Sequence, residues 1–182
     1  LFSLGACDSF KPADSITPPS NVYVGMTLTE FKALYPDNRD NPSGTCYYYW
    51  GDFAFFEDSE GNPVVARIQR DSSKSPFDVD AYYIASIDAF DKDGIQLSEK
   101  RIASLKQGMT VQEVVAWIGN PVTYSDSMGH MKWCLSENIE YLFTFTEKET
   151  DEGKDYFLIY ISRWDLTDDS VSYPLGTSPW NP

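Results

Sequence analysis

Two stretches of the chain, "VGMTLTEFKALYPDN" at residues 24–38 and "QGMTVQEVVAWIGNP" at residues 107–121, share the pattern Gly-Met-Thr-x-x-Glu. The copies stand 83 positions apart, and the same offset relates Trp50 to Trp133. Two tryptophans in register across otherwise diverged sequence indicate duplication of a whole unit rather than of a short motif. The predicted organisation is an N-terminal segment at residues 1–19, a first repeat at residues 20–95, a second repeat at residues 96–167 and a tail at residues 168–182.

The spacing that the two motifs share is typical of a helix start. Thr27 and Thr110 are predicted N-cap residues, and Glu30 and Glu113 stand three positions further on, so each pair can form a capping box. A catalytic or metal-binding role for these threonines and glutamates is disfavoured because capping explains both the residue types and their spacing. The glycine before each methionine suits a left-handed backbone conformation.

Each repeat is expected to be a helix-turn-helix followed by an antiparallel sheet. The motif helices are predicted at residues 27–35 and 110–118, and Ser98 is expected to cap an earlier helix that runs to about residue 107. In the first repeat, Pro18 and Pro19 leave room for only about one helical turn at the equivalent place. Strand-like runs follow, which predicts an α+β fold of two tandem repeats. The runs are 45–50, 53–58, 63–71 and 80–90 in the first repeat, and 130–136, 139–148 and 156–166 in the second.

Composition narrows the classes of partner. With 14 basic and 28 acidic residues the net charge is −14, so nucleic acid phosphates and anionic lipid headgroups are repelled. No stretch of 18 apolar residues is present, so no membrane-spanning segment is predicted within these residues. Solubility is the simplest explanation of the acidic surface, and a site for a basic protein is the alternative.

The first residues indicate a location. Leu4-Gly5-Ala6-Cys7 resembles a bacterial lipobox, in which the signal peptide is cut before a cysteine that receives a lipid. The polar, proline-bearing stretch that follows Cys7 is expected to act as a tether. These features predict an extracytoplasmic protein anchored to a bacterial membrane only through a lipid on Cys7.

An aromatic segment, "CYYYWGDFAFF" at residues 46–56, is the main candidate for a binding surface. Because side chains alternate along a strand, Tyr48 and Trp50 are expected on one face of the sheet and their neighbours on the other. Helices are expected to cover only one of these faces. The rings on the other face either pack within the molecule or meet a partner protein, since Tyr and Trp favour interfaces.

The twin motifs, the strands after them and the closing "ISRWDLT" at residues 161–167 resemble the β-lactamase inhibitor protein fold. The motif "GMTVQEVVAWIGNP" is also similar to that of envelope lipoproteins of the SmpA/OmlA (BamE) type. This resemblance implies that the two sheets join into one concave surface that grips a partner. Gly51-Asp52-Phe53 stands where the inhibitors insert a loop into the enzyme, although the matching loop of the second repeat is absent, and each repeat has one cysteine where the inhibitors have a pair.

Other candidate sites have simpler explanations. His130 is the only histidine, and its neighbours supply neither a nucleophile motif nor a second metal ligand at helical spacing. The sequence "DKDG" at residues 91–94 begins like a calcium loop but lacks the required glutamate at its twelfth position. Cys46 and Cys134 can be two thiols or one disulfide between the repeats. No catalytic residue, metal or cofactor is therefore predicted.

The preferred hypothesis is a lipid-anchored, non-catalytic module that binds another envelope or secreted protein. Its expected binding surface comprises Tyr48, Trp50, Asp52 and Phe53. The alternative hypothesis, taken from the resemblance, is an inhibitor of a serine β-lactamase or penicillin-binding enzyme, in which Asp52 would enter the enzyme pocket and Phe53 would pack beside it.

Overall fold

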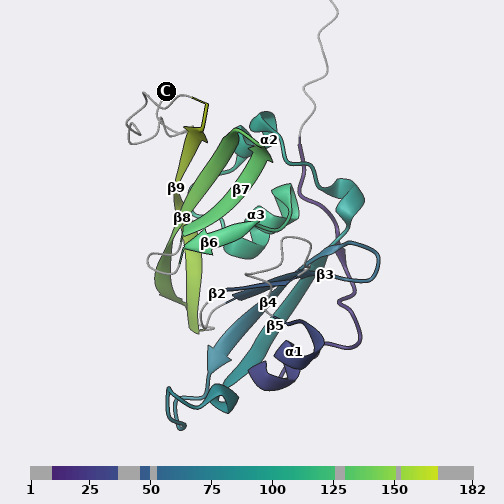
Figure 1. Cartoon of the computed structure of the whole chain (residues 1–182), viewed down its shortest axis with the longest axis vertical. Coiled ribbons are helices and arrows are strands. Elements are labelled where there is room, and N and C mark those ends of the chain that lie inside the picture. The colour runs from purple at the N-terminus through teal and green to yellow at the C-terminus, as the bar shows by residue number, and fades with distance from the viewer. Residues whose placement is uncertain (1–9, 37–45, 50–52, 126–129, 151–152, 168–182) are drawn as a thin grey trace, which may run out of the picture.

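The computed structural model describes residues 10–36, 46–49, 53–125, 130–150 and 153–167 and shows an α+β fold with two antiparallel sheets (Figure 1). The predicted fold class is confirmed at this level. The helices of the described residues are α1 (Leu28–Leu34), α2 (Glu99–Ser104) and α3 (Val111–Ile118), with the 3-10 turns η1 (Val79–Ala81) and η2 (Lys92–Gly94). The strands are β1 (Ser15–Ile16), β2 (Cys46–Tyr49), β3 (Phe53–Glu57), β4 (Pro63–Arg70), β5 (Tyr82–Phe90), β6 (Thr123–Ser125), β7 (His130–Ser136), β8 (Ile139–Thr150) and β9 (Gly153–Asp165).

These strands form two separate sheets. The five-stranded sheet has the order β1-β5-β4-β3-β2, and the four-stranded sheet has the order β6-β7-β8-β9. Within the described residues, no strand of one sheet pairs with a strand of the other. The edge strands β1 and β6 were not predicted from the sequence, because runs of 2 and 3 residues are too short to show a period.

Helix α1 covers one face of the five-stranded sheet. Its buried residues Leu28 and Phe31 pack against side chains that recur at every second position of β3 and β4. The ring centroids of Phe31 and Phe56 are 5.3 Å apart in an edge-to-face arrangement. The buried cluster on this face comprises Val22, Met26, Leu28, Phe31, Ala54, Phe56, Val64, Ala66, Ile68, Ile84 and Ala89.

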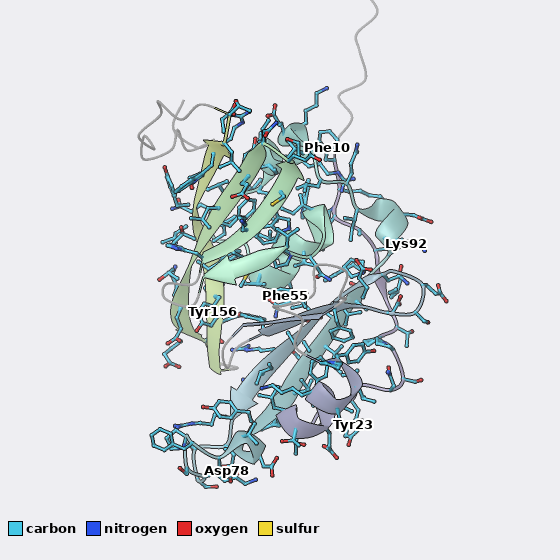
Figure 2. All side chains as sticks on the ribbon, in the orientation of Figure 1. Phe10, Tyr23, Phe55, Asp78, Lys92 and Tyr156 are labelled. Atoms are coloured by element: carbon cyan, nitrogen blue, oxygen red, sulfur yellow. The ribbon has the colours of Figure 1, made fainter. Side chains whose placement is uncertain are left out.

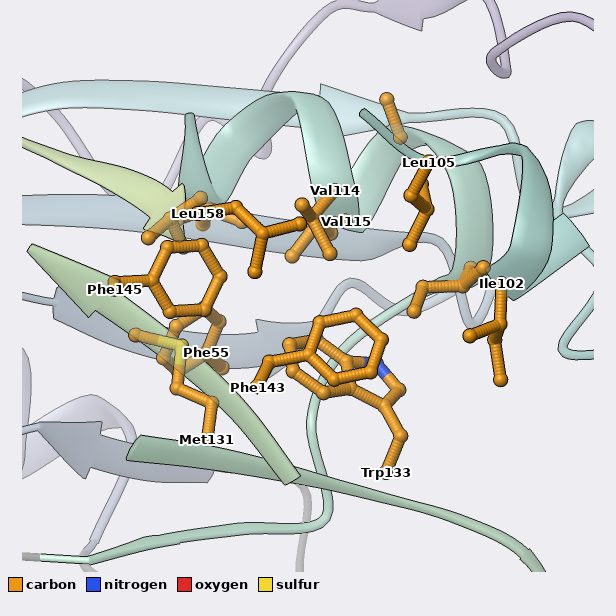
Figure 3. Close-up of a cluster of buried hydrophobic side chains, with 14 of the residues drawn as sticks. Phe55, Ile102, Leu105, Val114, Val115, Met131, Trp133, Phe143, Phe145 and Leu158 are labelled. Atoms are coloured by element: carbon orange, nitrogen blue, oxygen red, sulfur yellow. The ribbon is translucent and has the colours of Figure 1, made fainter. Parts of the chain in front are cut away.

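Helix α3 packs between the two sheets. Its residues Val111, Val114 and Val115 are completely buried. The cluster that surrounds them draws on both sheets (Figure 3), so the layers run in the order α1, five-stranded sheet, α3, four-stranded sheet (Figure 1). The strand residues of this cluster are Phe53, Phe55, Val65 and Phe90 from the five-stranded sheet, and Met131, Trp133, Tyr141, Phe143, Phe145, Leu158 and Ile161 from the four-stranded sheet.

This layering differs from the expected concave surface shared by two joined sheets. That arrangement would leave the second face of each sheet free of helices. Along β3, however, Phe53 and Phe55 alternate with Ala54 and Phe56, which gives the strand two apolar faces. Helix α3 occupies the second of these faces, so the aromatic residues of β3 pack within the molecule.

Both predicted capping boxes are present. The Thr27 hydroxyl accepts a hydrogen bond from the N–H of Glu30 at 3.2 Å, and the Glu30 carboxylate accepts one from the N–H of Thr27 at 2.8 Å. Thr110 and Glu113 make the same two bonds, also at 3.2 and 2.8 Å. The N-termini of α1 and α3 are therefore fixed by identical local chemistry, as the sequence predicted.

The corner before each capped helix is bonded to a strand of its own sheet. The N–H of Gly25 donates to the carbonyl of Ile84, and the N–H of Ile84 donates to the carbonyl of the methionine after Gly25, both at 2.8 Å. Gly108 and its methionine make the same pair of bonds with Leu158 at 2.8 Å. Gly25 and Gly108 have φ values of +92° and +89°, which side chains rarely adopt, so glycine is required at both corners.

The helix that precedes the corner exists in only one of the two units. Helix α2 begins after the N-cap Ser98 as predicted, but it ends at Ser104 rather than near residue 107. Between β1 and α1 the described chain makes turns and no helix. The helix-turn-helix expected in the first repeat is therefore a single helix.

Residues 10–19, which the sequence predicted to be part of a tether, pack on the rest of the protein. Ala13 is buried, and its N–H donates to the carbonyl of Ala116 in α3 at 2.7 Å. Ser15 and Ile16 form β1 on the edge of the five-stranded sheet. A Cβ atom at Gly94 would lie 2.9 Å from the Cβ atom of Ala13, so the close approach of this segment requires glycine. Residues 10–19 of the predicted tether therefore belong to the folded body.

Replacing either N-cap should destabilise the protein by a similar amount. We expect Thr27→Ala and Thr110→Ala each to lower the free energy of unfolding by about 1 kcal/mol, because the N–H of the third helical residue loses its acceptor. Thr27→Ser and Thr110→Ser keep a hydroxyl acceptor and serve as controls. Urea denaturation followed by circular dichroism measures the effect, and alanine variants as stable as the serine variants would contradict it.

Candidate functional site

The expected binding surface does not form one face in the structure. Trp50 and Asp52 lie outside the described residues. The strand register pairs Tyr48 with Ala54 and Tyr49 with Phe53, which places Tyr48 and Phe53 on opposite faces of the sheet. These residues therefore cannot act together as a single flat patch.

Phe53 is a core residue. Its side chain is 0% exposed, and its ring centroid lies 5.6 Å from that of Tyr156 in the four-stranded sheet. The prediction that Phe53 is available to a partner is wrong, because α3 and β9 cover the face of the sheet on which it lies. An aromatic ring on a strand with two apolar faces is equally consistent with a core and with an exposed patch, and the sequence alone did not distinguish them.

A different sheet face remains accessible. On the four-stranded sheet, the buried rows that face α3 alternate with rows whose side chains are partly exposed. One such row joins Lys132 to Leu142, and the next joins Cys134 to Glu140 and Trp164. We call this surface the outer face, and its partly exposed members are His130, Lys132, Cys134, Glu140, Leu142, Thr144, Tyr160 and Trp164.

The outer face was not among the predicted sites, although the sequence of β8 carries a signal for it. Within β8, Tyr141, Phe143 and Phe145 are buried, whereas Leu142 and Thr144 between them are partly exposed. This period of two predicts one covered and one open face. The aromatic segment at residues 46–56 drew attention instead, because it has the higher density of rings.

The polar groups of the outer face are organised around one ion pair. The ammonium group of Lys132 lies 2.9 Å from the carboxylate of Glu140, with both side chains partly buried. The thiol of Cys134 donates to the same carboxylate at 3.7 Å. On the neighbouring strand β9, the indole N–H of Trp164 donates to the hydroxyl of Ser162 at 2.9 Å. These contacts hold a tryptophan, a thiol and a charge pair in fixed positions.

Cys134 is a free thiol with low reactivity. Burial and the nearby Glu140 carboxylate raise its pKa, so the thiol stays protonated at neutral pH. A protonated thiol is a poor nucleophile and a poor metal ligand. Cys134 is a free thiol in the structure, whereas the side chain of Cys46 lies outside the part of the chain that the structure describes.

The described residues form no other arrangement that suggests a catalytic or metal-binding site. His130 is half-buried at the start of β7, where the register pairs it with Thr144 and Ser125. Among the described residues, no group of three or more His, Cys, Asp and Glu side chains is placed to hold a metal ion. No helix in the described part of the chain has both the length and the apolar character needed to cross a membrane.

A charged cluster lies where the two sheets meet. The guanidinium group of Arg67 on β4 is 3.9 Å from the carboxylate of Asp155 on β9, and the two side chains are only 12% and 19% exposed. Asp88 on β5 is half-buried nearby, and burial together with the charge of Asp155 raises its pKa. This cluster joins the two sheets electrostatically.

A scan against protein-family models, a search of curated proteins and a search of solved structures each found no match for this chain.

Replacing Asp88 should stabilise the protein near neutral pH. Because its folded-state pKa is raised, Asp88 favours the folded state only while it is protonated, and this stability is lost as pH rises through the folded-state pKa. We expect Asp88→Asn to be more stable than the wild type at pH 7 and to show no such gain at pH 3. Urea denaturation at both pH values measures the difference.

Asp155→Asn provides the contrast to this experiment. It also removes a neighbouring negative charge, but it leaves the largely buried Arg67 without its partner. We therefore expect it to destabilise the protein at pH 7. Equal stability of the wild type and Asp88→Asn at pH 7 would contradict the assignment.

Proposed function

We propose that this protein is a non-catalytic protein-binding module of the bacterial cell envelope, and that the outer face of the four-stranded sheet is its contact surface. The main support for the proposal is that Trp164, Tyr160 and Leu142 are partly exposed on this face. They lie around the ion pair of Lys132 and Glu140. An antiparallel sheet often packs one face on the core and leaves the other available.

The chemistry of this surface suits a protein partner. Tyr and Trp present a large apolar area with a polar tip, which is why they are enriched in protein interfaces. The ion pair of Lys132 and Glu140 adds directional charge in the middle of the sheet, and such groups contribute to specificity and orientation. The low reactivity of Cys134 fits a surface that recognises rather than transforms its partner.

We also propose that the two units arose by duplication. Support comes from the equivalent corners at Gly25 and Gly108, each followed by a capping box and each bonded to the last strand of its own sheet. The strand residues that accept these bonds, Ile84 and Leu158, stand 74 positions apart, whereas the glycines stand 83 apart. The units would then have diverged by insertion and deletion between the corner and the strand.

The inhibitor hypothesis is the weaker of the two. It required Asp52 and Phe53 to act together at an enzyme pocket, and Phe53 lies in the core. Asp52 belongs to the connection between β2 and β3 and lies outside the described residues. No observation on the described residues favours this function over general protein binding.

Lipid attachment at Cys7 is part of the proposal. It rests on the Leu4-Gly5-Ala6-Cys7 sequence, which resembles a lipobox. In cells of the source organism we expect the full-length protein to partition with membranes and Cys7→Ser to be released into the soluble fraction. Incorporation of labelled fatty acid into the wild type and not into Cys7→Ser is the second measurement, and equal membrane association of both would refute the anchor.

The binding surface is tested by capture followed by affinity measurement. The wild-type protein is used to capture partners from the envelope fraction, and the captured protein is then purified and titrated. We expect Trp164→Ala to weaken its affinity by about 30-fold, the effect of removing a central interface residue. Val24→Ala, which truncates an exposed residue at the α1 corner, is the matched control. If Trp164→Ala binds as tightly as the control, the outer face is not the contact surface.

A further inference from the structure

The connection between β4 and β5 exposes an aromatic ring almost completely. Phe77 is 97% exposed, and Val79 two positions later is 46% exposed. Figure 2 shows this end of the molecule at Asp78, far from the outer face of the four-stranded sheet. A phenylalanine exposed to this extent contributes almost no burial free energy to the fold itself.

The loop that carries Phe77 is closed by its own backbone. The N–H of Asp71 donates to the carbonyl of Ala81 at 2.7 Å, which joins the two ends of the loop. Inside it, the N–H of Lys74 donates to the carbonyl of Asp71 and the N–H of Asp78 donates to that of Ser75, both at 3.1 Å. Residues 71–81, which we call the Phe77 loop, therefore form successive tight turns rather than an open connection.

Side-chain hydrogen bonds also fix the loop, two of them to neighbouring elements and one within the loop itself. The hydroxyl of Tyr82 donates to the carbonyl of Pro76, next to Phe77, at 3.2 Å. The hydroxyl of Thr29 in α1 donates to the carboxylate of Asp80 at 2.7 Å. The ammonium group of Lys74 donates to the carbonyl of Asp80 at 3.0 Å. The ring is thus presented by a preorganised support, and binding through it would cost little further ordering.

The charges around the ring are mainly negative. Asp71, Asp78 and Asp80 lie in the loop, and hydrogen bonds from Ser73 lower the pKa of Asp71, so its carboxylate is ionised at neutral pH. Lys74 is the basic residue of the loop, and its ammonium group is already bonded within it. An anionic membrane surface would be repelled by this arrangement.

We propose that the Phe77 loop docks into a protein partner by inserting Phe77 into an apolar pocket that is bordered by Lys or Arg side chains. The exposed ring supplies the buried contact, and the carboxylates around it match a basic rim. This surface is distinct from the outer face, and the proposal does not depend on the proposed role of that face.

The test places a photoreactive analogue of phenylalanine, p-benzoylphenylalanine, at position 77 of the full-length protein in cells of the source organism. Irradiation should give a discrete adduct with one protein, which mass spectrometry identifies. The same analogue at Val24, another strongly exposed position, is the control for non-specific contact, and at Tyr160 it reports on the outer face. The identified protein is then purified and titrated with the wild type and with loop variants.

We expect Phe77→Ala to weaken that affinity by about 30-fold, and Phe77→Leu by less, without changing the melting temperature, because the ring is exposed. Asp78→Asn should slow association and reduce its dependence on salt. An adduct with phospholipid, an adduct with a second copy of this chain, the absence of a position-77 adduct, or an unchanged affinity of Phe77→Ala would each overturn the proposal. An adduct at position 160 without one at position 77 would leave the proposed function standing and remove only the loop.

Discussion

The burial of α3 between two sheets is the constraint on which the rest of the structure depends. Besides its apolar contacts, the C-terminal end of the helix is bonded in several directions. The carbonyl of Gly119 accepts from the indole N–H of Trp133 at 2.9 Å, and the side chain of Asn120 donates to the carbonyl of Phe56 at 2.8 Å. The carbonyl of Trp117 accepts from the guanidinium group of Arg101 at 2.8 Å. One helix end thus links both sheets and α2.

This position of α3 decides which surfaces are free to act. The five-stranded sheet is covered by α1 on one face and by α3 on the other, so its aromatic strand β3 is used for folding. The four-stranded sheet meets α3 on one face only, which leaves the outer face partly exposed. The Phe77 loop lies beyond the layers altogether. Surfaces for recognition therefore arise at the open side and at one end of the stack.

The sequence predicted the features that depend on neighbouring residues. The two capping boxes involve residues three positions apart, and the positive φ of Gly25 and Gly108 follows from the same short motif. The order of the layers was not predictable in this way. The apolar residues Val111, Val114 and Val115 require a partner surface, but their spacing is the same whether one sheet or two supply it. For the same reason the sequence is compatible with an exposed Phe53. The segment around Ala13 looks like a tether in sequence because its close contact with Gly94 joins residues that are far apart along the chain.

The direction in which a lipid anchor would hold the molecule favours a protein rather than a membrane as the target of the Phe77 loop. Only Asp8 and Ser9 separate Cys7 from Phe10, whose ring lies beneath the guanidinium group of Arg101 at 5.6 Å near α2. Figure 2 places Phe10 and Asp78 toward opposite ends of the long axis of the molecule. Three residue spacings reach at most about 11 Å, so a lipid on Cys7 would keep the α2 end near the bilayer. The Phe77 loop would then lie away from that membrane, which favours a protein surface as its counterpart.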